Sequence, residues 1–435
     1  MLARGIQKWD LVLLIINSII GAGIFGLPSK IFQLSGVYSL AAFGVCAAVV
    51  LIYILCFAEV SSRFKETGGP YLYIHSAFGP FPGFIMGWLL LLSRIFNYAT
   101  LINLLVTYTS FFSEALNTTA VRIIVILIVT TVLTYINHIG IKNATRVSNF
   151  FTIAKLLPLS IFIIAGLFFL QPEAFAVTNE IAISSFSTSV LLLIFAFGGF
   201  ESVLVNSGEV HNPSKNLPFA LITAILVVVI FYCLIQVVCI GTLPSLASSS
   251  KPLAEAATGF MGPFGGNLMA AGALVSIFGT LNVIMLSGSR LPFAFSNERQ
   301  FPQFFSFVHP KYLTPTWSLL LVAALAAIIS ITWTFLTALT IAAIIRVLLY
   351  LFVCASLIKL RQKNKSNSGY FKLRGGKVLA LAAILISLWL LSASKLTELR
   401  DTGICLAIGI IFYFLQQHHF KKINGAGNTE LKNSS

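Results

Sequence analysis

The sequence predicts an all-α integral membrane protein with twelve transmembrane helices, and its composition, its apolar runs and its charge distribution each support this. Of the 435 residues, 57% are hydrophobic and only 9% are charged, whereas about a quarter of the residues in a soluble domain are charged. The mean hydropathy of +0.94 is correspondingly high. Backbone groups that face lipid have no water to bond, so each span has to be helical.

Apolar runs suited to crossing the hydrocarbon core, which needs about 20 residues of helix, recur along the whole chain. They cover residues 9–33, 37–62, 81–113, 121–137, 150–170, 187–207, 217–243, 266–295, 316–330, 334–358, 378–394 and 403–417. Each run is interpreted as one helix, which places the predicted spans in sequence order from helix 1 to helix 12.

Lysine and arginine residues in the loops and near the ends of these runs lie mainly on one side of the predicted membrane. The segments on the side of the N-terminus hold most of them, including a cluster between residues 359 and 377. The opposite side has only Lys30, Arg122, Lys251, Lys395 and Arg400. By the positive-inside rule, both termini of this multi-pass cell-membrane protein are expected in the cytoplasm. The net charge of +15 follows from this topology, and we expect no binding to nucleic acid.

The sequence contains no group of residues with the spacing of an enzyme or metal site. The six cysteines lie in apolar stretches without CxxC or Cys/His spacing, which is typical of small buried hydrophobic residues. No nucleophile–histidine pair and no phosphate-binding glycine loop followed by Lys-Ser/Thr is present. We therefore expect neither catalysis nor a bound metal or cofactor.

Glycines interrupt the first apolar run near its middle, in the stretch IINSIIGAGIFGLPS at residues 15–29. Glycine weakens a helix, and in membranes it more often serves close helix packing. A second interruption, FAFGGFE at residues 195–201, lies in the sixth run, so each interrupted run opens a set of five. This is the layout of inverted-repeat transporters, whose discontinuous helices meet near the middle of the bilayer. We predict that helices 1 and 6 are broken.

A broken helix exposes amide groups at the start of one half and carbonyl groups at the end of the other. These ends hold an anion and a cation respectively, and an α-amino acid joins both charges in one small molecule. We expect its carboxylate to bind the amides of Gly21, Ala22 and Gly23. We expect its ammonium to bind the carbonyls near Ile19 and Ile20 and those of Phe195, Ala196 and Phe197.

These stretches, together with several others, resemble the amino acid–polyamine–organocation (APC) superfamily of transporters. The first is similar to the GxGIF signature of helix 1, and FAFGGFES at residues 195–202 is similar to the unwound motif of helix 6. Further similar stretches are AEVSSRFKETGGPYLY at 58–73, GEVHNPSKNLP at 208–218 and SRLPFAFSNERQFP from residue 289. The resemblance implies a five-plus-five inverted repeat with two additional C-terminal helices, and secondary transport by alternating access.

The resemblance also implies a division of the chain. Residues 1–360 would form the transporter core, with inverted repeats over roughly 9–170 and 187–358. Residues 361–377 would form a basic cytoplasmic loop, 378–417 helices 11 and 12, and 418–435 a cytoplasmic tail.

Charged residues inside a span are costly and are therefore candidates for function. Lys155 matches a helix 5 lysine of proton-coupled members of the superfamily, which occupies the space where sodium-coupled relatives of this fold hold an ion. The resemblance thus implies sodium-independent transport in which Lys155 carries a proton, while the alternative is a lysine that extends to the membrane interface. Glu201 follows the helix 6 break and is expected either to carry a proton or to brace the unwound backbone.

Helix 3 contributes two further polar residues, Arg94 and Asn97, one turn apart. Asn97 is expected to contact the substrate. Arg94 either pairs with a structural partner, which is the favoured interpretation, or recognises an acidic side chain. Arg346 on helix 10 has no assigned role.

Three other expectations concern packing around the site and the end of helix 2. Phe195, Phe197 and Phe200 are expected to form the apolar wall of the site. Asn282 on helix 8 is expected to add a polar contact. Glu59 is expected to anchor the cytoplasmic end of helix 2, with Arg63 one turn later.

The predicted function is secondary active transport of amino acids by alternating access, through proton coupling or exchange and without sodium. The expected partners are the small-molecule substrate, protons and membrane lipid. The alternatives are an amine or polyamine exchanger of the same fold, a membrane receptor that binds an amino acid without moving it, and an intramembrane enzyme.

Overall fold

The computed structural model describes residues 6–21, 23–64, 68–112, 118–139, 144–176, 181–205, 207, 210–312, 314–363 and 371–433. For residues 144–150 and 418–433 it describes the backbone alone. Regular structure in these ranges is helical apart from one isolated bridge between Ile6 and Val210. The all-α prediction is confirmed for this part of the chain.

Each predicted apolar run lies mostly within helix, and several helices extend well beyond their run. The first half of the chain forms α1 (Lys8–Ile19), α2 (Gly23–Ser35), α3 (Ser39–Ser62), α4 (Pro70–Phe78), α5 (Pro80–Thr109), α6 (Thr119–Ile139) and α7 (Ala144–Gly166). The second half forms α8 (Ile183–Phe197), α9 (Phe200–Leu204), α10 (Pro213–Thr242), α11 (Pro252–Asn297), α12 (Thr316–Thr332), α13 (Phe335–Lys363), α14 (Gly376–Ser392) and α15 (Leu396–Asn433).

The lengths and compositions of these helices are those of a multi-pass membrane protein. Among the described residues, eight helices are long and apolar enough to cross a membrane, with Gly23–Ser62 counted as one of them. The number rises to nine if α14 and α15, which are bent by 115° relative to each other, form one span. The count of twelve spans and the arrangement in two repeats stay predictions.

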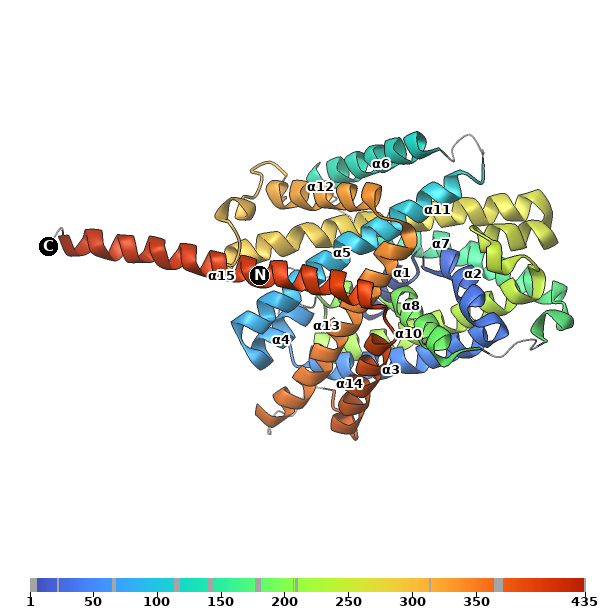
Figure 1. Ribbon diagram of the computed structural model, residues 1–435, viewed down its shortest axis with the longest axis horizontal. Coiled ribbons are helices and arrows are strands. Elements are labelled where there is room, and N and C mark those ends of the chain that lie inside the picture. Colours follow the sequence, from blue (N-terminus) through green and yellow to red (C-terminus); the bar gives the residue numbers. More distant parts are fainter. Residues whose placement is uncertain are drawn as a thin grey trace.

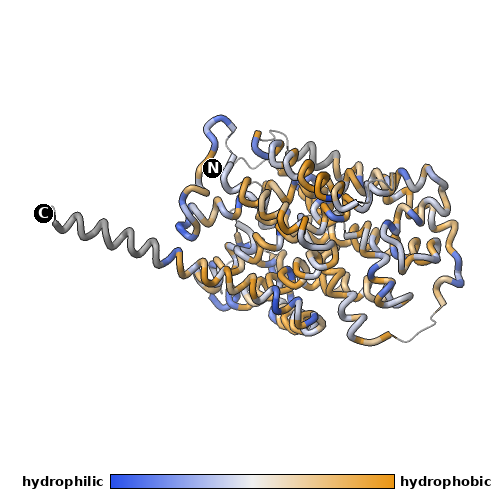
Figure 2. Tube along the Cα trace, turned by 45° about the horizontal axis from the view of Figure 1, so that its top comes forward, coloured by the Kyte–Doolittle hydropathy of each residue, from blue (hydrophilic) through white to orange (hydrophobic). Residues whose placement is uncertain are grey.

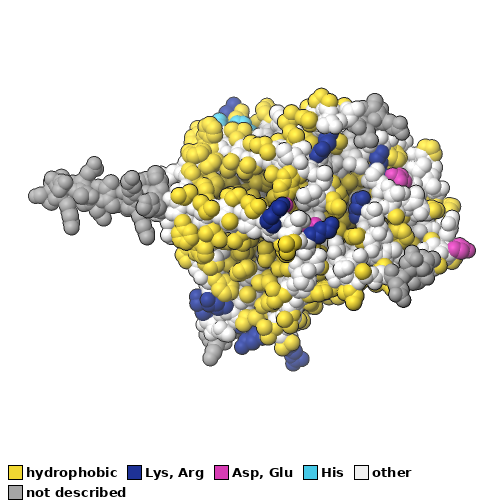
Figure 3. Space-filling view, in the orientation of Figure 1, with side chains coloured by type: hydrophobic (Ala, Val, Ile, Leu, Met, Phe, Trp, Pro, Cys, Tyr) yellow, Lys and Arg dark blue, Asp and Glu magenta, His cyan; other side chains and the backbone are white. Residues whose placement is uncertain are grey.

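The helices α6, α11 and α12 run nearly along the horizontal axis of Figure 1, and α5 crosses the molecule at an angle to them. Hydrophilic stretches gather in the loops at the two ends of this axis (Figure 2). Large areas of the face in Figure 3 are hydrophobic and carry few charged side chains. Exposed apolar side chains such as Ile164 of α7 and Leu385 of α14 are what a surface in contact with lipid requires.

Two helices break in the centre of the molecule, where the glycines predict it. α1 ends at Ile19, Ile20 is extended with φ −71° and ψ 93°, and α2 begins at Gly23. α8 ends at Phe197 and α9 begins at Phe200. Ala22, which is part of the first break, lies outside the described residues.

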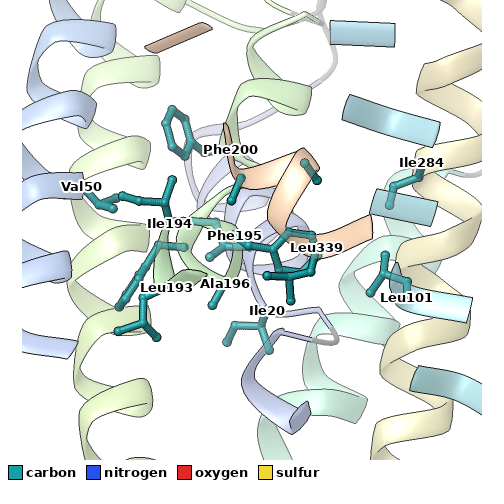
Figure 4. Packing of buried hydrophobic residues seen from close by; sticks show 14 of the residues in the cluster. Ile20, Val50, Leu101, Leu193, Ile194, Phe195, Ala196, Phe200, Ile284 and Leu339 are labelled. Atoms are coloured by element: carbon teal, nitrogen blue, oxygen red, sulfur yellow. The ribbon is translucent and has the colours of Figure 1, made fainter. Parts of the chain in front are cut away.

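Glycine is required at the second break for a steric reason. Gly199 has a φ of +121°, in a region that side-chain-bearing residues rarely adopt. A Cβ atom there would also overlap the carbonyl oxygen of Ser18 on α1. The same closeness holds at Gly23, where a Cβ atom would lie 2.8 Å from the Cα of Ala196. The two breaks therefore pack directly against each other (Figure 4).

Candidate functional site

A small cavity lies between the two breaks and the helices α5, α11 and α13. Its polar lining comes from Asn17, Ser18, Arg94, Asn97, Ser202, Thr280 and Arg346. About 40 Å³ of it is open to the centre of a water molecule, whereas one water needs roughly 10–15 Å³. In this conformation the cavity suits a small polar group.

The structure brings many of the predicted site residues to this cavity. Ile19, Gly21, Gly23, Asn97, Phe195 and Ala196 line it. Figure 4 shows Phe195 and Ala196 beside Ile20, with Leu101 of α5 and Ile284 of α11 across from them. Leu101 and Ile284 also line the cavity and form part of its apolar wall.

Four described residues of the predicted site lie outside the cavity lining, namely Ile20, Phe197, Phe200 and Asn282. The side chains of the last three contact neighbouring helices instead. The ring of Phe197 packs against Tyr232 at 5.0 Å between centroids. Phe200 packs against Phe57 and Tyr350. Asn282 accepts a hydrogen bond from Asn137 of α6 at 2.8 Å. The apolar wall and the α11 contact expected from these residues are therefore not part of the cavity lining.

Lys155 of α7 lies at the broken end of α1 and is completely buried. Its Nζ donates to the carbonyl oxygens of Ile20 at 2.7 Å and Asn17 at 3.1 Å, and it lies 3.4 Å from Oγ1 of Thr280. The C-terminal end of a helix carries partial negative charge, so this is a favourable position for a cation. The side chain links α1, α7 and α11 and does not extend to the surface.

Tyr232 of α10 joins the ends of both broken helices. Its hydroxyl lies 3.2 Å from the carbonyl oxygen of Ile19 on α1 and 3.1 Å from that of Ala196 on α8. The sequence does not single out this residue, because one tyrosine in a long apolar run is indistinguishable from the aromatic residues that pack the core.

Glu201 lies in the first turn of α9 and is surrounded by donors. Its Oε2 accepts hydrogen bonds from the Gly199 amide at 2.9 Å and from the Tyr350 hydroxyl at 3.1 Å. Its Oε1 accepts one from Nε of Arg346 at 3.2 Å. Arg346 also donates through Nη1 to the carbonyl oxygen of Phe195 at 3.0 Å. This arginine, which has no partner assignable from the sequence, thus connects α13 to both sides of the second break.

Arg94 forms a long ion pair with the same carboxylate but no hydrogen bond to it. Its Nη2 lies 4.0 Å from Oε1 of Glu201, which is beyond hydrogen-bond distance. No hydrogen-bond partner for Nη2 lies within the described part of the chain, although this side chain is only 3% exposed. Oδ1 of Asn97, one turn further along α5, is likewise buried without a partner among the described residues.

Side chains of the protein thus occupy the carbonyls that the sequence assigns to a ligand ammonium. Lys155 bonds the carbonyl of Ile20, and Arg346 bonds that of Phe195. The Tyr232 hydroxyl, which has a single proton to donate, lies within hydrogen-bond distance of the carbonyls of both Ile19 and Ala196. A carbonyl oxygen has two lone pairs. Both are used at Phe195, whose carbonyl also accepts from the Gly198 amide at 3.3 Å, whereas the Ala196 carbonyl retains the capacity for one more hydrogen bond. The start of α2 at Gly23 presents the positive end of a helix to the cavity.

Glu59 forms a second buried charge cluster at the end of α3. It pairs with Arg63 at 2.8 Å, as predicted, and it also accepts from Nε of Arg361 at 2.7 Å and from the amide of Leu373 at 3.0 Å. The last two partners lie at the end of α13 and before α14, so Glu59 ties three segments together. Within the described ranges, no three His, Cys, Asp or Glu side chains gather in a way that could hold a metal ion.

Comparison with known proteins gives consistent matches over nearly the whole chain. A family model described as amino acid permease matches residues 6–413. The chain is 28% identical over 406 residues to the Serine/threonine exchanger SteT of Bacillus subtilis (strain 168), covering 91% of this chain and 92% of that protein. It is 26% identical over 444 residues to the Branched-chain amino acid permease BcaP of the same organism, covering 97% and 95%. It is 25% identical over 460 residues to the Methylthioribose transporter of that organism, again covering 97% and 95%.

Proposed function

We propose that this chain, which belongs to the amino acid permease family, moves amino acids by alternating access without sodium, through proton coupling or exchange. Amino acid transport itself follows from the family and from relatives named as an exchanger and a permease. These proteins are transporters and not enzymes. The single observation that carries the mechanism is the meeting of two broken helices at a buried, charged cavity.

The proposed pose of the amino acid follows from the polarity of the breaks. Its carboxylate lies at the start of α2, where Gly21 and Gly23 line the cavity and the helix end is positive. Its ammonium faces the end of α8, where Phe195 and Ala196 line the cavity and the Ala196 carbonyl offers its second lone pair. Asn97 contacts the ligand from α5. Phe197, Phe200 and Asn282 are not included, since they lie outside the lining.

Lys155 is the proposed proton carrier because of what surrounds its ammonium. A lysine ammonium has three donors, and Ile20, Asn17 and Thr280 supply three acceptors. Loss of a proton removes one donor and the charge, which weakens the hold on the end of α1. Protonation at this position is thereby linked to the position of a helix that lines the cavity.

Glu201 is proposed to brace the second break and not to carry the proton. Its three neighbours at hydrogen-bond distance, the Gly199 amide, the Tyr350 hydroxyl and the Arg346 guanidinium, all donate to it. An ionised carboxylate is an acceptor only, so it satisfies all three donors. A protonated carboxyl group would add an O–H donor that has no acceptor among these neighbours.

Uptake into proteoliposomes tests the proposed function. Purified protein is reconstituted, and labelled amino acids are offered with a proton gradient, a sodium gradient or internal unlabelled amino acid. We expect uptake that responds to the proton gradient or to internal amino acid and is unchanged by sodium. Competition with methylthioribose and with putrescine separates amino acid transport from transport of a thiosugar or an amine. Binding without uptake would indicate a receptor, and sodium-driven uptake would contradict the proposal.

The variant Lys155→Met tests the proton carrier. We expect it to lose the response to the proton gradient and to transport slowly, because the α1 end loses its cation. Lys395→Met is the matched control, since Lys395 is exposed and lies outside the cavity. Full uptake by Lys155→Met with unchanged pH dependence would show that the lysine has no coupling role.

A further inference from the structure

We propose that the amino acid carried by this protein has a second carboxylate on its side chain, and that Arg94 of α5 binds this carboxylate. The inference rests on the proposed function and adds the substrate class. Two observations support it. The charges around the cavity do not balance, and Arg94 and Asn97 on one face of α5 each have a buried polar atom without a hydrogen-bond partner among the described residues.

The charges around the cavity do not balance. Arg94 and Arg346 line it, and Lys155 lies buried at its edge. Among the described residues around the cavity, these three cations face one carboxylate, that of Glu201, which is 1% exposed. Buried charges are stable when they are paired. A zwitterionic neutral amino acid leaves this excess of positive charge unchanged, whereas an acidic one reduces it by one charge.

Arg346 and Arg94 differ in how closely they contact the Glu201 carboxylate. Arg346 bonds the carboxylate at 3.2 Å and the Phe195 carbonyl at 3.0 Å. Arg94 stays 4.0 Å from the carboxylate, and its Nη2 has no acceptor within the described residues. The side chain nevertheless lines the cavity and is 3% exposed. A buried guanidinium that belongs to a cavity-lining residue and has an unfilled donor is suited to a carboxylate ligand, which it can bind through two parallel hydrogen bonds.

The walls near Arg94 fit the rest of an acidic side chain. The start of α2 at Gly23 takes the α-carboxylate in the proposed pose, which leaves Arg94 for a second one. Leu101, one turn beyond Asn97 on α5, and Ile284 on α11 line the cavity with apolar surface, against which the methylene groups of the side chain can pack. Oδ1 of Asn97 is a buried acceptor without a partner in the described part of the chain, and it suits the ligand ammonium.

The test compares acidic amino acids with their amides, which have the same shape without the charge. Proteoliposomes take up labelled L-glutamate in the presence of L-glutamate, L-aspartate, L-glutamine or L-asparagine as competitors. For the unmodified protein we expect the acids to compete at concentrations at least about tenfold below those of the amides. In the variant Arg94→Gln we expect this preference to fall by about 10- to 100-fold, and in Arg94→Lys, which keeps the charge, to fall less.

The matched control is Arg400→Gln, which removes an exposed arginine paired with Asp401 on α15 and should leave the preference unchanged. Equal competition by acids and amides in the unmodified protein would overturn this inference while the proposed function stands. Absence of uptake for every amino acid would instead refute the proposed function. If Arg94→Gln does not fold, the competition in the unmodified protein still decides the substrate class. A preference for acids that persists in a folded Arg94→Gln variant would show that Arg94 does not read the side chain.

Discussion

Replacing Gly199 by alanine should destabilise the protein through the contact between its two broken helices. Gly199 has φ +121° and ψ −27° between α8 and α9. An L-residue forced into an unfavourable left-handed conformation costs about 1–2 kcal/mol. The added Cβ would also overlap the Ser18 carbonyl oxygen and lie 2.9 Å from its carbon.

The steric part of the cost cannot be relieved by a small shift of α1. Lys155 and Tyr232 hold the carbonyls of Asn17, Ile19 and Ile20 on either side of Ser18. Overpacking of a well-packed interior costs about 1–3 kcal/mol. Together with the backbone cost, we expect Gly199→Ala to lower the free energy of unfolding by about 2–5 kcal/mol, and to displace the cavity lining.

Thermal unfolding of the purified protein in detergent, followed by the fraction that remains monodisperse, measures this change. Gly44→Ala on α3 is the control, because Gly44 is exposed and has no heavy atom within 4 Å of an added Cβ. Alanine there is expected to be neutral or to stabilise by about 0.5–1 kcal/mol. A Gly199→Ala protein that unfolds at the original temperature and transports at the original rate would refute the steric reasoning.

Three further substitutions test neighbouring contacts. Tyr232→Phe removes the hydroxyl that joins the two breaks, and thermal unfolding should show a loss of about 1–3 kcal/mol; an unchanged midpoint would mean that the hydroxyl contributes nothing. Glu59→Gln keeps the shape of the side chain but removes the charge that pairs with Arg361, so we expect a loss of about 3–5 kcal/mol in the same assay. A variant as stable as the unmodified protein would contradict this expectation. Asn282→Ala should leave uptake unchanged and cost about 1 kcal/mol through its bond to Asn137, and loss of uptake in a stable variant would place Asn282 in the site.

Features with a direct backbone effect could be predicted from the sequence. Glycines at 21, 23, 198 and 199 indicated both helix breaks, because glycine acts on the chain where it stands. Lys155 and Glu201 stood out because a charge inside a span is costly. The pairing of Glu59 with Arg63 could be predicted because the two lie one helical turn apart.

Features that depend on how helices face each other could not be predicted. Lipid and protein interior are both apolar, so the hydrophobic pattern does not indicate which face of a span points inward. The prediction that Phe200 and Asn282 line the cavity is wrong for this reason, since each contacts a neighbouring helix instead. The partner of Arg346 is Glu201, 145 residues earlier in the chain, and no local pattern links them.

The side chains that hold the broken helices have a thermodynamic consequence for ligand binding. Lys155, Tyr232 and Arg346 already bond carbonyls at both breaks. The unwound backbone is therefore ordered before a ligand binds. Preorganisation of this kind spares an incoming molecule the entropy loss of fixing a loop. Calorimetry of an amino acid binding to this protein should therefore lack the large unfavourable entropy of coupled folding.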